Sequence, residues 1–355
     1  MKRCPVAALA LMTALALCAA AGCRPSSNDA LKAPVAEEEA PPWLSGRVTG
    51  LELLTTLKVE AGPKSVELMP DGRHLWVNDL YAHRCFIFSI EDYARTMAIS
   101  LPDEPVEVDF SPDGREAWVS LYNSAKVVVV DIDGGAVIAS VPTGAVPKEV
   151  QVSPDGRWVY VSNWDSNSVT VIDAAARAAV KTVPLYGTPR GICFSPDGGL
   201  AYVCVMGGDT LAVFDTAGGH LVTKQIYCGE NPRHVLCTRG GEYLYVSNNI
   251  PGTVTKLDRL NGTILGTAKV GSKARTIALT PDEGWLFVCN YDDNAVGCVD
   301  TASMRQVFTR GCSKPIGMAV SPSGDRLFVS NYAPPQVSVF AITREESGEE
   351  SGVGP

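Results

Sequence analysis

The amino-acid sequence predicts an all-β protein, and three observations lead to this fold class. First, a four-residue turn of the Ser-Pro-Asp-Gly type recurs seven times, with its second position at residues 70, 112, 154, 196, 239, 281 and 322. Second, short apolar stretches separated by polar loops fill the intervals between these turns. Third, no stretch shows the 3.6-residue periodicity that a helix needs. A period of about 42 residues with four strands per repeat is typical of a propeller blade, so the sequence predicts a seven-bladed β-propeller with four antiparallel strands per blade.

The third repeat illustrates the order of the elements. Its turn, from Ser153 to Gly156, suits a chain reversal because Pro presets φ at the first corner and Asp and Gly tolerate the remaining positions. Strands are predicted over residues 158–162, 168–173 and 180–183. A loop containing Gly or Pro then leads to a fourth strand, which precedes the next turn and which we place innermost in its blade.

The two ends of the repeat region predict how the ring closes. An apolar strand from Leu51 to Val59 has no turn before it, whereas the last repeat ends after Val337 to Phe340 and lacks an outermost strand. We expect the N-terminal strand to complete the seventh blade, because this removes a free sheet edge that would invite aggregation. The propeller is therefore predicted over residues 47–343.

Two strands carry a resemblance to a known family of repeats. Val159-Tyr160-Val161-Ser162-Asn163 and Leu327-Phe328-Val329-Ser330-Asn331, each preceded by a Pro-Asp-Gly-type turn, resemble the YVTN family of β-propeller repeats. The resemblance covers residues 47–343 and implies a propeller that serves as a binding scaffold, although the ligands of that family are mostly unassigned. Some related propellers are lactonases or lyases that use His and Glu at the channel mouth.

The N-terminus has the features of an export signal. Lys2 and Arg3 are followed by an uncharged stretch over residues 5–22, which ends in Ala20-Ala21-Gly22-Cys23. These four residues resemble the bacterial lipobox, which implies a signal peptide over residues 1–22 and a lipid on Cys23. An ordinary cleaved signal and an uncleaved anchor are the alternatives. Because Arg24 and not Asp follows the cysteine, analogy with enteric bacteria favours the outer over the inner membrane of the cell envelope.

The segments that flank the repeats are acidic. We expect a flexible tether over residues 23–46 and a disordered tail over residues 344–355. Loss of residues 1–22 takes the formal charge from −9 to −11, so we expect no nucleic-acid partner. Apolar residues make up 46% of the chain, which excludes a mainly disordered protein. The chain is expected to be a monomer that contacts the membrane through lipidated Cys23.

Basic residues recur where the innermost strands begin. This position is basic in five of the seven repeats: Lys64, Lys148, Arg190, Arg233 and Arg275. Neighbouring loops on the same face supply aromatic residues: Tyr122, Trp164, Tyr291 and Tyr332. Such a set around the channel mouth favours an anionic ligand, namely an envelope glycan, a peptide or a partner protein. Alternatively, these residues bond blade backbones, wedge adjacent blades, or pair with Glu107 and Glu149.

Signals for catalysis are few. His234, between Arg233 and Val235 at the channel mouth, is the one histidine worth testing, whereas His74 and His220 are expected to be solvated. A non-catalytic scaffold is therefore the first hypothesis, and a lactonase-like hydrolase or lyase using His234 with Glu107 or Glu149 is the alternative. No Cys-x-x-Cys, close histidine pair or Gly-rich phosphate loop occurs, so we expect neither a metal nor a cofactor.

The cysteines divide by position in the chain. Cys4 and Cys18 belong to the predicted signal peptide. Eight others lie in the repeats: Cys85, Cys193, Cys204, Cys228, Cys237, Cys289, Cys298 and Cys312. An even number in an oxidising compartment permits disulfides, but their pairing does not follow from the sequence. Most occupy strand positions that suit a small buried side chain, and Cys228 and Cys312 are the better candidates for a disulfide or a reactive thiol.

Overall fold

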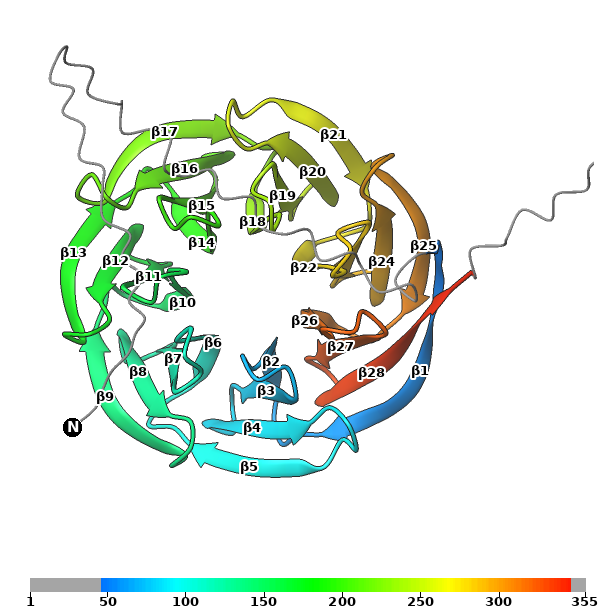
Figure 1. Ribbon diagram of the computed structural model, residues 1–355, viewed down its shortest axis with the longest axis horizontal. Helices are drawn as coiled ribbons and strands as arrows, with labels where there is room; N and C mark the ends of the chain where they lie inside the picture. The colour runs from blue at the N-terminus through cyan, green and yellow to red at the C-terminus, as the bar shows by residue number, and fades with distance from the viewer. Residues whose placement is uncertain (1–45, 346–355) are drawn as a thin grey trace, which may run out of the picture. The chain divides into compact units, whose positions relative to one another are not determined.

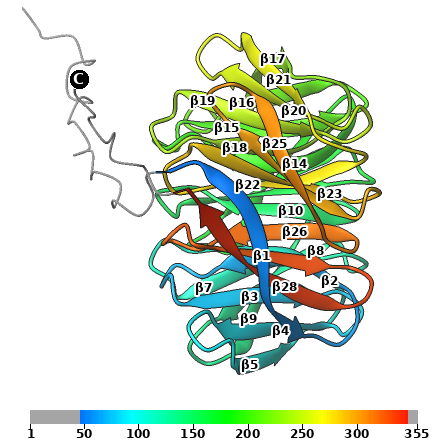
Figure 2. The same cartoon turned by 90° about the vertical axis from the view of Figure 1, so that its right-hand side faces the viewer.

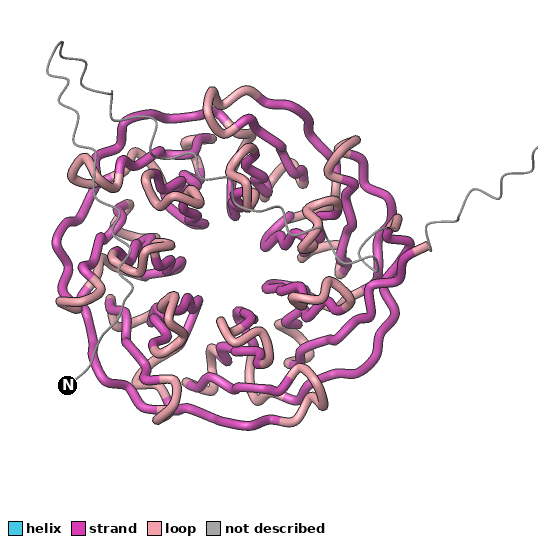
Figure 3. Tube along the Cα trace, in the orientation of Figure 1, coloured by secondary structure: helices cyan, strands magenta, loops and turns pink. Residues whose placement is uncertain are grey.

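The computed structural model describes residues 46–345, which form twenty-eight β-strands in seven four-stranded antiparallel sheets. The sheets surround a central axis as seven blades (Figure 1), and the described chain consists of strands and loops only (Figure 3). Within these residues no helix is long and apolar enough to cross a membrane. The predicted seven-bladed β-propeller is therefore confirmed. Cys23 and the predicted signal peptide lie outside the described residues, as do nearly all of the tether and the tail.

In blades 1 to 6 the strands follow the chain from the channel to the rim. Blades 1 to 3 contain β2 (Pro63–Leu68), β3 (His74–Asp79), β4 (Arg84–Ser89) and β5 (Arg95–Ser100); β6 (Pro105–Phe110), β7 (Glu116–Leu121), β8 (Lys126–Asp131) and β9 (Ala136–Pro142); and β10 (Pro147–Val152), β11 (Trp158–Asn163), β12 (Ser168–Asp173) and β13 (Ala178–Pro184). Blades 4 to 6 contain β14 (Thr188–Phe194), β15 (Leu200–Met206), β16 (Thr210–Asp215) and β17 (Leu221–Tyr227); β18 (Pro232–Cys237), β19 (Tyr243–Asn248), β20 (Thr253–Asp258) and β21 (Ile264–Lys269); and β22 (Ala274–Leu279), β23 (Trp285–Asn290), β24 (Ala295–Asp300) and β25 (Arg305–Gly311).

Blade 7 joins the two ends of the repeat region. It contains β26 (Pro315–Val320), β27 (Arg326–Asn331), β28 (Gln336–Arg344) and, outermost, β1 (Val48–Lys58). β1 pairs antiparallel with β28 from Val48 opposite Arg344 to Lys58 opposite Gln336, and Figure 2 shows the two strands side by side. The predicted closure is therefore confirmed, and β1 begins three residues before the expected Leu51 because its pairing continues to the end of β28.

The recurring turn is held by its own side chains. In the third repeat the amide of Gly156 donates to the carbonyl of Ser153 (2.8 Å), and Gly156 has a φ of 71°, in the left-handed region that favours glycine. The hydroxyl of Ser153 donates to Asp155 (2.5 Å) and accepts from the amide of Trp158 (2.9 Å). All seven turns lie at the same end of their blades, and we call this side the turn face. The opposite side, where the chain passes from one blade to the next, is the mouth face.

Candidate anion-binding site in the channel

The channel side of each blade is shaped by a break in strand pairing. In all seven blades the register between the innermost strand and its neighbour shifts near the start of the innermost strand, after its first residue in six blades and after its second, Pro189, in blade 4. In blade 3, for example, the shift lies between Pro147 and Val150, so Lys148 and Glu149 leave the regular ladder. Such an irregularity re-aims side chains. This shift explains why two consecutive residues of one strand, such as Lys148 and Glu149, can both lie at the channel.

Arg190 is the most deeply buried of the five predicted cations, with 5% of its surface exposed. Its guanidinium donates to Glu107 at 3.0 Å and lies 3.4 Å from Glu149. The three residues come from the innermost strands of blades 4, 2 and 3, so one cation bridges three blades. For Arg190 the structure therefore shows the ion pairing that the sequence left as an alternative to ligand binding.

Two further cations lie against the predicted aromatic residues. The ammonium of Lys148 is 3.7 Å from the ring centre of Tyr122 and 5.7 Å from that of Trp164. The guanidinium of Arg275 is 3.9 Å from the ring centre of Tyr291. Cation–π contacts of this kind stabilise a charge without neutralising it. Burial, with Arg190 and Arg233 nearby, lowers the pKa of Lys148 to about 7.

Lys64 and Arg233 have no ion-pair partner among the described residues. Burial, followed by the charges of Arg190 and Arg233, holds the pKa of Lys64 well below its usual range. Burial and the neighbouring Arg190 and Arg275 likewise lower the pKa of Arg233. These mutual effects indicate that the basic residues of several blades lie close enough to influence one another's charge.

Tyr332 lies apart from this set of contacts. Its ring packs at 60° to that of Tyr81 with centroids 6.0 Å apart, and the two hydroxyls are hydrogen-bonded to each other. Within residues 46–345 neither ring has a cation over it. Three of the four predicted aromatic residues therefore meet a cation of the ring, and Tyr332 instead meets a tyrosine of the neighbouring blade.

Carboxyl groups lie in the channel beyond the cations. Burial and the charge of Glu107 raise the pKa of Glu149 to about 8, and burial raises that of Asp109 to about 6. Burial, with Glu107 and Glu149, also raises the pKa of Glu67 well above its usual range. Glu67 and Asp109 are not among the site residues that the sequence predicts. Both lie four residues after the proline that begins their strand, so extending the comparison of repeats along the strand would have found them.

His234 shares a small enclosed cavity of about 10 Å³ with Glu107, Glu149, Arg190 and Arg233. Its Nδ1 is buried and has no hydrogen-bond partner among the described residues. Burial and the two arginines lower its pKa to about 3, so the imidazole is neutral. A polar cavity of this size holds about one water molecule. The structure thus brings together all three residues of the predicted catalytic alternative.

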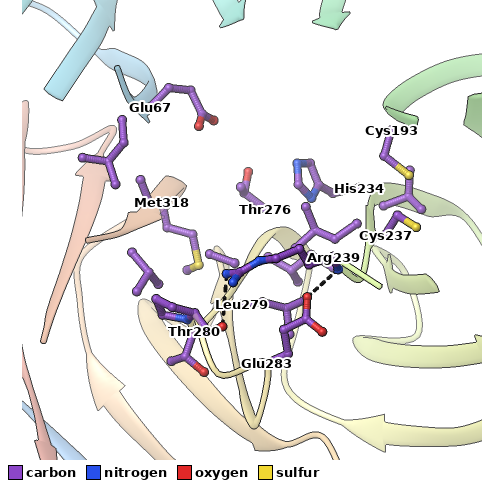
Figure 4. Close-up of a pocket in the computed structure, with 18 of the residues that line it drawn as sticks. Glu67, Cys193, His234, Cys237, Arg239, Thr276, Leu279, Thr280, Glu283 and Met318 are labelled. Carbon is purple, nitrogen blue, oxygen red and sulfur yellow. Dashed lines mark hydrogen bonds between the residues drawn. The ribbon is translucent and has the colours of Figure 1, made fainter. Parts of the chain in front are cut away.

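A larger cavity of about 470 Å³ extends from the same region to the turn face. Glu67, His234 and Thr276 lie on one side of it in Figure 4, with Met318 among the apolar residues of its wall. At its outer end the amide of Arg239 donates to Glu283 (2.5 Å). The channel is therefore hollow on the turn face and filled by charged side chains toward the mouth face.

Two expectations about individual residues were wrong. His220 is buried (7% exposed) because its ring packs on Trp158 at 4.4 Å and its Nδ1 meets the hydroxyl of Tyr160 at 2.8 Å. Cys228 and Cys312 are buried free thiols whose pKa burial raises, so neither has the low-pKa, accessible environment of a reactive thiol. The other six cysteines of the propeller are also free thiols. Within residues 46–345 no group of three or more His, Cys, Asp or Glu could hold a metal ion.

Solved structures show the same fold in proteins of different kinds. Kuenenia stuttgartiensis hydrazine synthase superposes with a TM-score of 0.73 at 21% identity, covering 84% of this chain and 100% of that one. The Cps50 (Swd1) beta-propeller domain of Myceliophteria thermophila also gives 0.73, at 10% identity, covering 83% of this chain and 100% of the domain. At these identities the likeness concerns the fold alone. No curated protein sequence matches the chain.

A family model describes a large part of the sequence. The model of the lactonase, 7-bladed beta-propeller family matches residues 57–214 and 186–264, which together make up more than half of the chain. The matched part contains Lys64, Lys148, Arg190, Arg233 and His234. The chain therefore belongs to the lactonase, 7-bladed beta-propeller family.

Proposed function

We propose that the channel mouth binds a ligand carrying carboxylate or phosphate groups. One observation carries this proposal: five basic residues occupy equivalent positions at the channel in a chain of net charge −9, and Lys64 and Arg233 form no ion pair in the described part of the chain. Charges that are partly withdrawn from water, as these two are, are normally paired because lost solvation costs free energy. An anion that contacts these two cations would supply the missing pairing.

The surroundings make the mouth selective for anions even though the chain as a whole is acidic. A cleft lined by one sign of charge between low-dielectric walls concentrates the field at its opening. Arginine forks match carboxylate and phosphate oxygens in two parallel hydrogen bonds. An acidic envelope glycan, a peptide carboxy-terminus or an acidic patch of a partner protein fits this chemistry. A nucleic acid fits it less well, because its long backbone would meet the acidic remainder of the surface.

Calorimetric titration of the full chain with inorganic phosphate, at low and at moderate salt, tests the anion site. We expect saturable binding to one site, weakened by salt and by at least about tenfold in the double variant Arg233→Gln/Arg275→Gln, since charged hydrogen bonds contribute about 1.5–3 kcal/mol each. Arg305→Gln, an exposed arginine on β25, is the matched control and should bind as the wild type does. Absence of binding, or equal binding by the double variant, would refute the anion site.

Hydrolysis of an anionic lactone is a second candidate, favoured by the family match and by the shared cavity of His234, Glu107 and Glu149. Water attacking the ring carbonyl would break the ring C–O bond, and the leaving oxygen would take a proton from Glu149, whose raised pKa keeps it protonated at neutral pH. The proton released by the water would pass to solvent, with neutral His234 orienting the nucleophile. Arg233 would stabilise the developing negative charge.

A panel of lactones with and without a carboxylate tests this candidate, with spontaneous opening subtracted. We expect turnover of the acidic lactones only, and a fall in kcat of at least about 100-fold in Glu149→Gln. Turnover that survives His234→Asn would remove the role given to the histidine. No turnover of any lactone would leave binding as the function of the site.

We also propose that the chain is attached to the cell envelope, preferentially the outer membrane, by a lipid on Cys23. The support is the sequence pattern around residues 20–23 and the polar segment that follows it. Growth with labelled palmitate should label the wild type and not Cys23→Ser, and a signal-peptidase II inhibitor should cause the precursor to accumulate. Labelling that persists in Cys23→Ser would overturn the proposal.

A further inference from the structure

Two cysteines lie where blades 4 and 5 meet. Cys193 is on β14 and Cys237 is on β18, the innermost strands of these two blades. Both residues line the cavity of about 470 Å³ that opens to the turn face, and Figure 4 shows their sulfur atoms on the same wall of it. Their side chains also belong to one apolar cluster. The two thiols therefore share a packed cluster and a cavity that solvent can enter.

Strand pairing directs the side chain of Cys193 toward blade 5. Cys193 lies opposite Tyr202 in the ladder between β14 and β15, and residues that are directly opposed in an antiparallel pair point to the same face of the sheet. The hydroxyl of Tyr202 accepts a hydrogen bond from Arg259 (3.3 Å), which follows β20 in blade 5. Because Tyr202 reaches blade 5 from this face, the thiol of Cys193 points to blade 5 as well.

The repeat shows how closely these two positions approach each other. Counted from the proline of each innermost strand, the equivalents of the two cysteines in blades 2 and 3 are Asp109 and Val152. The amide of Val152 donates to a carboxyl oxygen of Asp109 at 2.7 Å, so a side chain at the first position reaches the backbone of the second in the next blade. The strands of blades 4 and 5 also run close together, since a Cβ added to Gly191 would lie 2.7 Å from the Cα of His234.

We propose that Cys193 and Cys237 are the site of a disulfide that joins blades 4 and 5, formed by exchange with a small disulfide such as oxidised glutathione. The structure contains the dithiol form. The thiolate of Cys237 attacks one sulfur of the oxidant, whose S–S bond breaks and releases a first thiolate. The thiolate of Cys193 then attacks the sulfur of Cys237 and expels the second. The two cysteine protons end on the two released thiols, and two electrons pass to the oxidant.

Accessibility assigns the first attack to Cys237. Of the eight cysteines within residues 46–345, seven are buried and Cys237 is partly exposed. Burial raises the pKa of Cys237 to about 11, although the charge of Arg259 opposes this effect. Burial and the neighbouring Cys237 raise the pKa of Cys193 well above its usual range. Because only the thiolate reacts, the exchange should be slow at neutral pH and should accelerate about tenfold per pH unit up to about pH 10.

Peptide mapping after oxidation tests the proposal. The full chain is incubated with oxidised glutathione at about pH 9, the remaining thiols are blocked, and the digest is analysed by mass spectrometry. We expect the intact chain to lose the mass of two hydrogen atoms and a peptide pair to be linked through Cys193 and Cys237, both reversed by dithiothreitol. Mapping that finds these two thiols free, or links other cysteines such as Cys204 and Cys228 of the same cluster, would overturn the proposal.

Single substitutions test the order of the two steps. In Cys193→Ala the second thiol is missing, so Cys237 should remain joined to one glutathione. In Cys237→Ala the accessible thiol is missing, so Cys193 should stay unmodified. Cys228→Ala, a buried cysteine of the same cluster, is the matched control and should still form the link. Glutathione on Cys193 in the Cys237→Ala variant would overturn the proposed order of attack.

The thermal midpoint shows whether the native contact accommodates the bond. The disulfide would close a loop of more than forty residues and restrict the unfolded chain, so the midpoint of the oxidised wild type should rise by several degrees. Cys237→Ala should melt alike with and without the oxidant. A lower midpoint of the oxidised wild type would show that the bond strains the two blades, and would overturn its assignment as a native cross-link. Neither result depends on anion binding, because no cation of the channel mouth takes part.

Discussion

Glu149 illustrates how burial and charge pairing compete at a single residue. Its carboxyl lies 3.4 Å from Arg190, yet burial and the nearby Glu107 raise its pKa to about 8. In an unfolded chain the pKa of a glutamate is about 4.3. The folded state therefore retains this proton to higher pH, and its contribution to stability is present at low pH and is lost as the pH rises from about 4 to about 8.

We predict that Glu149→Gln flattens the dependence of unfolding free energy on pH over this range. The variant should be more resistant to urea than the wild type at about pH 8, and the two should converge near about pH 4, where the wild-type carboxyl is protonated. Urea unfolding at a series of pH values measures this. Glu52→Gln, an exposed residue of β1, should leave the profile unchanged. Parallel profiles for wild type and Glu149→Gln would contradict the prediction.

For individual residues, the sequence predicts where the basic side chains of the channel lie along the chain but not which carboxyl groups they pair with. Comparing repeats identified Lys64 and Arg190 as equivalent cations, because the repeat places both at the start of an innermost strand. It could not show that Arg190 pairs with Glu107, which is 83 residues away, while Lys64 stays unpaired. Whether an ion pair forms depends on the direction of each side chain, and the paired side chains come from three different blades.

At the scale of elements, neighbouring innermost strands approach closely where their pairing shifts. A Cβ added to Gly191 on β14 would lie 2.7 Å from the Cα of His234 and 2.8 Å from the carbonyl oxygen of Arg233, both on β18. These are backbone atoms of the next blade, and they cannot move independently. Glycine is therefore required at this position by the contact between strands.

We predict that Gly191→Ala forces blades 4 and 5 apart and lowers the free energy of unfolding by about 1–3 kcal/mol, the usual cost of overpacking. Urea unfolding measures the loss, and weaker anion binding should accompany it because Arg233 lies at the same contact. Gly311→Ala is the matched control, since no heavy atom lies within 4 Å of a Cβ built at Gly311. Equal stability of the two variants would show that the strands can separate without cost.

The closing strand β1 has one buried and one exposed leucine close together. Leu57 is 4% exposed and packs in the core shared by blades 7 and 1, whereas Leu54 is 45% exposed. Leu57→Ala should lower the free energy of unfolding by about 2–4 kcal/mol, and Leu54→Ala by less than about 0.5 kcal/mol. Thermal or urea unfolding gives both values. A comparable effect of the two substitutions would mean that β1 is not held by its inward face.

The role of β1 was accessible from the sequence because one apolar strand was left over at the N-terminus and one was missing at the C-terminus. The sequence predicts that this strand starts at Leu51, but it starts at Val48. Val48 and Gly50 pair with β28 across an irregularity that the residue pattern does not predict. For the same reason the shifted register of the innermost strands was not predicted, although every blade contains it.

At the scale of the whole molecule, the repeat predicted a closed ring but not the state of its channel. Whether the channel is open depends on where long side chains from several blades meet. Arg190, Glu107 and Glu149 fill it toward the mouth face, and a cavity of about 470 Å³ remains toward the turn face. The composition does not predict where the basic residues lie either, because a net charge of −9 does not indicate that cations cluster at one end of the channel.

Ring closure also determines how the molecule should unfold. Each blade packs mainly on its two neighbours, as in linear repeat proteins, but β1 and β28 join the first and last parts of the chain in one sheet. The ring therefore has no terminal blade that can open alone. Opening blade 7 exposes the edges of blades 6 and 1, and these lose their packing in turn.

We predict that Leu57→Ala accelerates hydrogen exchange of the slowest amides throughout the ring, and not only in β1 and β28. A loss of about 2–4 kcal/mol in global stability corresponds to about 30- to 1000-fold faster exchange for amides that exchange only through complete unfolding. Peptides covering β11 and β15, in blades 3 and 4 across the channel, should show the same factor as those covering β27, measured by mass spectrometry under native conditions. Leu54→Ala should leave all of them unchanged. Faster exchange confined to β1 and β28 would mean that the closing strand frays locally and that the blades do not form one cooperative unit.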